Sequence, residues 1–303
     1  MLRGSRNVVF TLILGSLIWS PPVLAQTCGN AVFGGGFEYG DVTDWSVQVG
    51  GAAVGATPTV FRIDTLALRD PHVFLDLSIF GCLDGTDNIP LPGAESINTT
   101  IDASLNEDSD GDGCLDTTSL LAFRPLVSAS TGGETVDFRS GQCSSATACG
   151  PGNTGVGSRT AYDTQSTGLC SEPVAGTTSG YSPAVVSPAA PCFGSDIGTA
   201  DLAFLGDVPL NPQDVRIAAT FSGGEPATGL VDGLLYGFLP ENEADLFLLP
   251  ADLPLVGGQP LSSLFPGGTG NCSGADDRDI HNGSVGWWIY LDFSASAVAW
   301  SYL

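Results

Sequence analysis

Four aspartates between residues 108 and 116 form the segment of this sequence whose spacing most clearly suggests chemistry. Three carboxylates stand at alternate positions, a glycine follows them, and a fourth comes later; the residues are Asp108, Asp110, Asp112, Gly113 and Asp116. Carboxylates this close repel one another unless a cation neutralises them, and hard oxygen ligands suit calcium. The spacing therefore predicts a calcium site formed by the four aspartates, with Gly113 permitting a sharp turn. A solvated acidic turn is the alternative.

The segment 108–116 resembles the calcium loops of EF-hand, dockerin and thrombospondin type 3 modules. In that pattern the first, third and fifth positions, here Asp108, Asp110 and Asp112, supply carboxylate oxygens. The segment departs from the EF-hand at the twelfth position, where Ser119 replaces a bidentate glutamate, and its flanks have strand rather than helix patterns. Thrombospondin-like loops fit better, although they occur in arrays and this chain has one copy. The resemblance implies structural calcium rather than calcium sensing.

Two aromatic side chains and a carboxylate alternate near the C-terminus. Trp288, Tyr290 and Asp292 share one face of an expected strand over 285–293, whose opposite face is apolar. Aromatic rings beside a carboxylate can stack on a sugar ring and hydrogen-bond to it, so this face is a candidate glycan site. The alternative is burial, with the face covered by a loop or by the segment 140–195.

The sequence carries no GxSxG, HExxH or strand-linked GxGxxG motif, and it assigns no catalytic residues. The two histidines are His72 and His281, and His72 lies in a strand pattern where an ordinary packed or exposed histidine is expected. Glycoside hydrolysis requires a pair of carboxylates at a suitable separation, which 33 acidic residues permit. A secreted, glycan-directed hydrolase that uses paired carboxylates is therefore the alternative function.

Eight cysteines set the expected covalent frame, and their even number predicts four disulfides. They are Cys28, Cys82, Cys114, Cys143, Cys149, Cys170, Cys192 and Cys272. Nearness in sequence favours the pairs Cys143 with Cys149, Cys170 with Cys192, Cys82 with Cys114, and Cys28 with Cys272. Structural zinc is the competing use, but the chain has no CxxC motif and two histidines.

Residues 1–25 have the pattern of a signal peptide. Arg3 and Arg6 precede an apolar run, and small residues follow at the expected cleavage position. The run is shorter than a membrane span and is interrupted by Pro21 and Pro22, which disfavours a membrane anchor. No other segment is apolar and long enough to cross a membrane. The sequence predicts a secreted, periplasmic or cell-surface protein, a compartment in which disulfides persist.

The charge of the chain excludes several partners and chemistries. The formal net charge is −24, and all nine basic residues are arginine. So acidic a surface disfavours nucleic acid and anionic membranes. The absence of lysine excludes Schiff-base chemistry and a phosphate-binding P-loop lysine.

Apolar residues recur at every second position over much of the chain, which predicts strands. The alternation is clear in 72–80, 214–221 and 285–293, and weaker in 58–68, 119–127, 199–206 and 229–239. The 41 glycines and 20 prolines provide turns. A short helix is expected at 240–245, where proline precedes acidic residues. The predicted fold is all-β, a β-sandwich or jelly roll.

One domain, residues 26–303, is expected to follow the signal peptide. Within it, 140–195 is rich in Gly, Ser, Thr, Pro and Cys, which predicts a loop insertion held by two disulfides, with a flexible linker as the alternative. Residues 35–45, from Gly35-Gly36-Phe37 to Trp45, resemble the opening strand of secreted carbohydrate-binding jelly rolls. The chain as a whole resembles uncharacterised secreted bacterial proteins. The resemblance of residues 35–45 implies a jelly roll and a sugar ligand, whereas the whole-chain resemblance implies no activity.

Together the patterns favour a secreted, non-enzymatic protein. Calcium and disulfides are expected to stabilise an extracellular scaffold that binds glycan or assembles with other components of the cell surface.

Overall fold

The computed structural model describes most of the chain beyond residue 57. The described residues are 58–77, 81–89, 95–108, 111–115, 117–151, 157–200, 210–249, 251, 256–270, 272 and 276–301. The predicted signal peptide (1–25) and the jelly-roll-like segment (35–45) lie outside these ranges.

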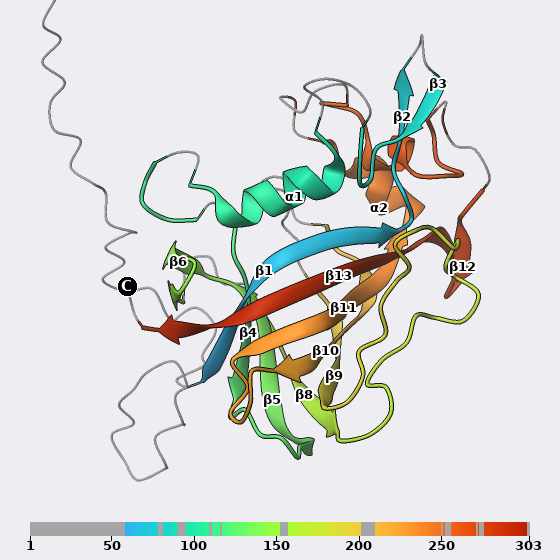
Figure 1. Ribbon diagram of the computed structural model, residues 1–303. Helices are drawn as coiled ribbons and strands as arrows, with labels where there is room; N and C mark the ends of the chain where they lie inside the picture. Colours follow the sequence, from blue (N-terminus) through green and yellow to red (C-terminus); the bar gives the residue numbers. More distant parts are fainter. Residues whose placement is uncertain are drawn as a thin grey trace, which may run out of the picture.

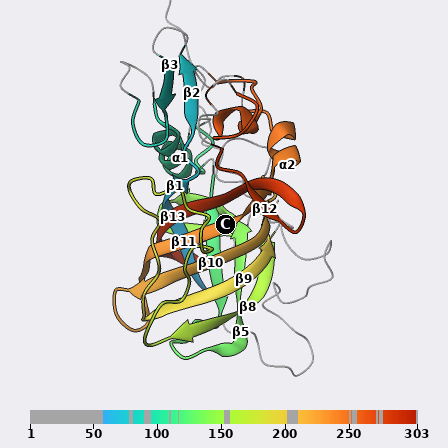
Figure 2. The ribbon, with the colours of Figure 1, turned by 90° about the vertical axis from the view of Figure 1, so that its right-hand side faces the viewer.

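Eight antiparallel strands of the described chain close into a barrel (Figures 1 and 2). In order around the barrel they are β1 (Thr59–Asp70), β4 (Ser119–Arg124), β5 (Thr131–Ser140), β8 (Gly157–Gln165), β9 (Cys192–Thr199), β10 (Gln213–Ser222), β11 (Gly229–Pro240) and β13 (Ser284–Trp300). Each strand pairs with the next along the chain, and β13 returns to pair with β1. The all-β prediction is confirmed. The sandwich or jelly-roll part is not confirmed, because one sheet closes on itself as a meander.

Alternating side chains of the eight strands fill the barrel interior. Phe123 lies among three rings, with centroids 5.7 Å from Phe61, 5.1 Å from Tyr162 and 4.9 Å from Phe193, each edge-to-face. Trp287 on β13 is fully buried in the same core. Edge-to-face packing is a favoured aromatic geometry. The interior is therefore a packed core. A functional site is expected on the described loops or on the outer face of the barrel.

Shorter elements attach to the barrel. They are β2 (Phe74–Leu77), β3 (Gly81–Asp84), β6 (Gln142–Ser145), β7 (Ala148–Gly150), β12 (Asp279–His281), α1 (Ile97–Asn106), α2 (Glu241–Leu246) and the 3₁₀ helix η2 (Leu261–Leu264). The predicted helix at 240–245 corresponds to α2, with Pro240 at its N-cap. The longest described helix, α1, has 10 residues, and no helix in the described ranges is long and apolar enough to cross a membrane.

The proline and acidic residues at 240–245 predicted α2, but no sequence pattern was recognised for α1. Ser96 caps this helix, because its hydroxyl accepts a hydrogen bond from the backbone N–H of Thr99 (3.2 Å). Ile101 and Leu105, four residues apart on one face, are fully buried against the barrel core. The helical signal was present in this spacing, but two threonines and the short length weakened it.

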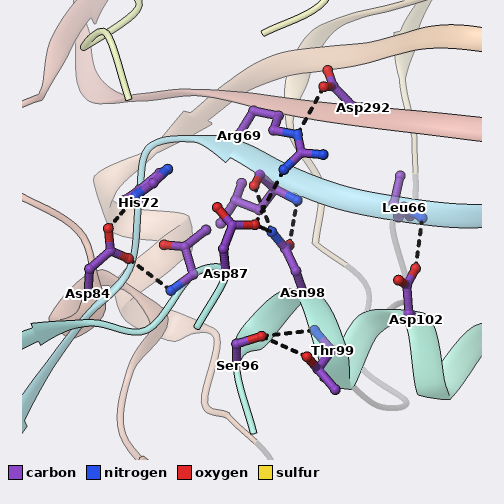
Figure 3. A network of polar contacts seen from close by, with 12 residues as sticks. Leu66, Arg69, His72, Asp84, Asp87, Ser96, Asn98, Thr99, Asp102 and Asp292 are labelled. Atoms are coloured by element: carbon purple, nitrogen blue, oxygen red, sulfur yellow. Dashed lines mark hydrogen bonds and ion pairs between the residues drawn. The ribbon is translucent and has the colours of Figure 1, made fainter. Parts of the chain in front are cut away.

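Helix α1 also completes the edge of β1 (Figure 3). β4 pairs with β1 over Thr59–Arg62, and beyond that point α1 lies along β1. The side chain of Asn98 accepts from Leu68 N (2.7 Å) and donates to Leu68 O (3.0 Å), and Asp102 accepts from Leu66 N (3.3 Å). Polar side chains one helical turn apart thus satisfy backbone groups that would otherwise need another strand.

A long irregular segment, residues 166–191, lies over the outer face of the barrel; we call it the strap (yellow-green in Figure 1). Val174, Val185 and Val186 of the strap pack on an aromatic cluster of β11 and β13. The predicted insertion over 140–195 needs correction, because β8 is a full barrel strand within it. The composition of β8 is polar, since its outward positions face solvent, and this hid the strand.

Three disulfides are seen among the described residues. Cys143–Cys149 and Cys170–Cys192 agree with the predicted pairing. Cys82 instead bonds to Cys272, so the pairs Cys82–Cys114 and Cys28–Cys272 were wrong. Cys114 is also disulfide-bonded, with a partner outside the described residues. Nearness in sequence failed here because barrel closure brings the β2–β3 hairpin beside the chain near residue 272.

Candidate functional site

The predicted glycan face of β13 lies beneath the strap. Trp288 is 7% exposed and Tyr290 is fully buried, while the alternate residues of β13 point into the barrel, as predicted. The Tyr290 hydroxyl accepts from Val174 N (3.0 Å) and contacts Thr177 Oγ1 (2.5 Å). Asp292 accepts from Arg69 Nε (2.9 Å). The structure therefore buries this face of β13, which was the alternative to an open glycan site.

The predicted calcium loop is described in part, since Asp110 and Asp116 lie outside the described residues. Asp108 Oδ2 accepts from Gly113 N (2.9 Å), and Asp112 Oδ1 accepts from Cys114 N (2.7 Å). Gly113 has φ 86°, in the left-handed region that the turn requires. Among the described residues no group of three or more His, Cys, Asp or Glu side chains could hold a metal ion. The four-aspartate site therefore stays a prediction.

A pocket of about 400 Å³ opens between β2 and the segment 256–270. It is lined by Phe74, Leu75, Asp76, Val256, Gln259, Pro260, Ser263, Leu264, Thr269, Gly270 and Cys272. The disulfide Cys82–Cys272 fixes one wall, because it joins the β2–β3 hairpin to the far side of the pocket. The disulfide and the pairing of β2 with β3 thus fix the shape of the pocket wall.

The pocket combines one aromatic ring with several neutral polar groups. Phe74 and Asp76 come from β2, and Gln259, Ser263 and Thr269 face them from the other side. Ser263 Oγ donates to Pro260 O (2.7 Å) and also lies 3.3 Å from Gln259 Oε1, so the two polar side chains are held close together. None of the described lining residues is cationic. Such a lining suits a neutral, hydroxyl-rich ligand better than an anion.

Beside the pocket, His72 forms a dyad with Asp84 (Figure 3). His72 Nδ1 lies 2.5 Å from Asp84 Oδ2, and the His72 side chain is 5% exposed. Tyr181 of the strap stacks on the imidazole, with ring centroids 3.9 Å apart. Burial opposes the charge of Asp84, but hydrogen bonds from His72 and Thr86 outweigh it and lower the pKa of this carboxyl. His72 Nε2 is buried and has no hydrogen-bond partner among the described residues.

Two further carboxyls meet the strap at Ser179. The backbone N–H of Ser179 donates to Asp70 (2.7 Å), and its hydroxyl donates to Asp277. Burial raises the pKa of Asp70 to about 6, with a smaller contribution from the charge of Asp277. Burial also raises the pKa of Asp277, whose Oδ2 is buried without a partner. We call Asp70, Asp84 and Asp277, with His72, the carboxylate cluster.

The pocket and the carboxylate cluster are neighbours. Phe74, in the pocket wall, lies two residues after His72, and its ring centroid is 6.4 Å from that of Tyr181. Burial, and then the charges of the three carboxylates, raise the pKa of Tyr181 to about 12. Tyr181 therefore keeps its proton and covers His72 from the side of the strap.

The second histidine, His281, lies in the β12–β13 hairpin, whose turn contains Asn282 (φ 50°) and Gly283 (φ 83°). His281 Nε2 lies 2.5 Å from Asp214 Oδ2, and the imidazole packs on Trp288 with ring centroids 4.8 Å apart. In the described part of the chain neither histidine contacts a serine or threonine hydroxyl. The sequence identified both histidines, but the partner carboxylates lie 12 and 67 positions away, so spacing could not reveal the dyads.

Comparison of the chain with protein families, with characterised proteins and with solved structures found no match. The geometry and chemistry of the described residues are therefore the basis for a function.

Proposed function

We propose that this chain is an extracytoplasmic scaffold protein that binds a neutral saccharide in the pocket between β2 and the segment 256–270. The observation that carries the proposal is the lining itself. Phe74 offers an apolar ring face, while Asp76 and Gln259 stand at positions suited to hydrogen-bond sugar hydroxyls. The volume of about 400 Å³ is in the range of small-ligand sites and suits one or two sugar units.

The charge of the molecule supports a neutral ligand. The net charge is −24, and the described lining includes a carboxylate and no cation. An anionic sugar such as a uronate or a phosphorylated glycan would be repelled by this field. A neutral glycan gains the polar contacts without that cost.

Export to an oxidising compartment is part of the proposal. The three described disulfides and the signal-peptide pattern of residues 1–25 support it. One disulfide forms a pocket wall, so reduction would act on ligand binding as well as on stability.

Calcium is proposed as a structural ion at 108–116. Asp108 and Asp112 already shape this turn through backbone hydrogen bonds, and Cys114 within it is covalently anchored. The binding screen is therefore run with calcium and with a chelator. Calcium is expected to raise the thermal midpoint without changing glycan affinity, since the loop residues are absent from the pocket lining. The thermal midpoint is measured with calcium and with chelator, in wild type and in Asp108→Asn. If calcium leaves the midpoint of both proteins unchanged, calcium is not part of the proposal.

The test of the main proposal is a neutral-polysaccharide and glycan-array screen of the oxidised protein, followed by calorimetry on any glycan bound. Phe74→Leu is expected to lower affinity by about 2- to 12-fold, because a stacking contact is worth about 0.5 to 1.5 kcal/mol. Asp76→Asn is expected to bind the glycan more weakly than Asp163→Asn does. Both aspartates are exposed on strands, but Asp163 lies on β8, away from the pocket. Equal affinities of these two variants, or no glycan bound, would overturn the proposal.

A secreted glycan-directed hydrolase is the second candidate, favoured by one observation. Near His72, the pKa of Asp70 is raised to about 6 by burial, whereas hydrogen bonds overcome burial and lower the pKa of Asp84. Carboxyls whose environments drive their pKa values apart can divide acid and base roles. The same glycans are therefore assayed for release of reducing ends by wild type and by Asp70→Asn. Release that is lost in the variant would favour the hydrolase over the binding protein.

A further inference from the structure

The strap is attached to the barrel at both ends and along its middle. The Cys170–Cys192 disulfide and the bridge between Leu169 and Ala189 fix its two ends. Its middle, residues 171–187, is held by Tyr290 and by three carboxylates. These carboxylates are Asp70, Asp277 and Asp292. The ends are therefore fixed by a covalent bond and a β-bridge, whereas the middle is held by noncovalent contacts.

Two of these carboxylates accept hydrogen bonds from the same strap residue, Ser179. Asp70 is 2% exposed and takes the backbone N–H of Ser179, while Asp277 takes the hydroxyl of the same serine. Within the described ranges, neither forms an ion pair with an arginine: Arg69 binds Asp87 and Asp292, and Arg278 binds Asp276 and Glu241. The other carboxylate oxygen of Asp277, Oδ2, is buried and has no hydrogen-bond partner in the part of the chain that the structure describes. A buried carboxylate with so few donors is costly when it is ionised.

The other charged and titratable groups around the pair add repulsion. Asp277 faces Asp279 and Asp276, and Asp70 faces Asp277 and Asp279. His72 is a basic side chain that acts on both, and it is already hydrogen-bonded to Asp84. Tyr181 and Tyr290 complete the surroundings. Negative charge thus accumulates under residues 179–181 when these acids lose their protons.

We propose that the middle of the strap is a proton-operated cover, closed over the aromatic face of β11 and β13 when Asp70 and Asp277 are protonated and released when both are ionised. Release exposes Tyr236, Trp288 and Tyr290, which Val174, Val185 and Val186 cover in the closed form. The proposal does not depend on the saccharide pocket, whose lining contains no strap residue.

The direction of the pH dependence follows from whether burial or the Ser179 hydrogen bond has the larger effect on the pKa of Asp70. The Ser179 N–H bond favours the ionised form, but burial under the strap disfavours it more, and the net result is a pKa near 6 in place of 3.8. Closing therefore takes up a proton, and the closed form loses stability as pH rises toward neutrality. For Asp70 alone, the ratio of closed to open strap falls by at most about 60-fold between pH 4 and pH 7. This limit is reached if opening restores the ordinary pKa of 3.8.

Hydrogen exchange on the full oxidised protein tests this. Protection of the amides of 171–187, after correction for the intrinsic pH dependence of exchange, is expected to be at least tenfold higher at pH 4.5 than at pH 7.5. Amides of β10 and β11 report on global unfolding and are expected to show no such drop. Equal strap protection at the two pH values, or a parallel drop in β10 and β11, would overturn the proposal.

Variants of Asp70 and Asp277 separate the effect of these two carboxyls from the titration of other groups. Asp70→Asn and Asp277→Asn keep an acceptor oxygen for Ser179 but cannot ionise, so each is expected to retain at pH 7.5 part of the protection that wild type has at pH 4.5. Asp163→Asn, exposed and remote on β8, is the matched control and should behave as wild type. Either single variant suffices if the other does not fold. A folded variant with the full wild-type drop would contradict the proposal.

Discussion

Single polar side chains complete backbone pairing in this fold, and Asn98 is the clearest case. Its amide occupies the place of a missing strand at Leu68 and also donates to Asp87 (2.8 Å). Asn98→Ala would leave a buried N–H and a buried carbonyl without partners, at about 1 to 3 kcal/mol each. We expect a loss of about 2 to 6 kcal/mol in the free energy of unfolding, measured by urea unfolding. Asn242→Ala, exposed in α2, is the control and should change little.

A close backbone approach fixes Gly286 at the start of β13. A Cβ there would lie 2.2 Å from the carbonyl oxygen of Leu239 on β11, and a paired strand cannot move away easily. Gly286→Ala is expected to cost about 1 to 3 kcal/mol in the free energy of unfolding. Gly133→Ala on β5, where a Cβ would contact nothing within 4 Å, should be near neutral in the same assay.

At the scale of elements, three adjacent strands are joined through one buried carboxylate. Asp137 on β5 accepts from Arg124 on β4 (2.9 Å) and from Arg159 on β8 (2.6 Å). Burial would raise the pKa of Asp137, but the hydrogen bonds from the two arginines lower it overall. A lowered folded pKa adds stability above the ordinary value of 3.8, and this stability is lost as pH falls through the folded value.

Asp137→Asn should therefore destabilise the protein at pH 7 and flatten the acid limb of its stability profile. We expect about 2 to 4 kcal/mol at pH 7, because two partly buried arginines lose their counter-charge. The matched control is Asp196→Asn, whose ion pair with Arg216 is exposed and is worth below about 1 kcal/mol. Urea unfolding at pH 7 and pH 3 measures both. A wild-type-like acid limb in Asp137→Asn would contradict this account.

Elements were predictable where one face was apolar and the other polar. The alternation in 214–221 and 285–293 correctly marked β10 and β13, because each strand buries one face in the barrel. Alternation could not reveal β8, whose buried side chains are few, nor the closure of the sheet. Closure depends on β1 pairing with both β4 and β13, a contact between the two ends of the described barrel.

Over the whole molecule, the Cys82–Cys272 disulfide joins segments 190 residues apart and borders the pocket. The chain-entropy relation gives about 5 kcal/mol for a loop of that length and about 2 kcal/mol for the six-residue separation of Cys143–Cys149. Replacing both cysteines of the first pair by serine should therefore cost more than replacing those of the second. Urea unfolding measures the difference, and equal losses would contradict it.

The candidate site could not be predicted because it exists at the scale of the whole molecule. Its pocket joins Phe74 to Gln259 and Thr269, and its carboxylate cluster joins Asp70 to Asp277. Each set is drawn from opposite ends of the described chain, so no local spacing indicates it. The aromatic face of β13 was located correctly by alternation, but its cover depends on where the strap lies.

Asn98 has a consequence for how the protein is produced. Asn98-Thr99-Thr100 is an acceptor sequence for N-linked glycosylation, and the sugar would be attached to the nitrogen that donates to Leu68 O in the folded chain. In a host that glycosylates nascent chains, this modification would keep α1 from docking on β1. Expression in a bacterial periplasm avoids the problem. Thr100→Ala also avoids it, at the cost of one hydrogen bond to Ser96 O, and peptide mass analysis of α1 would show which molecules carry the glycan.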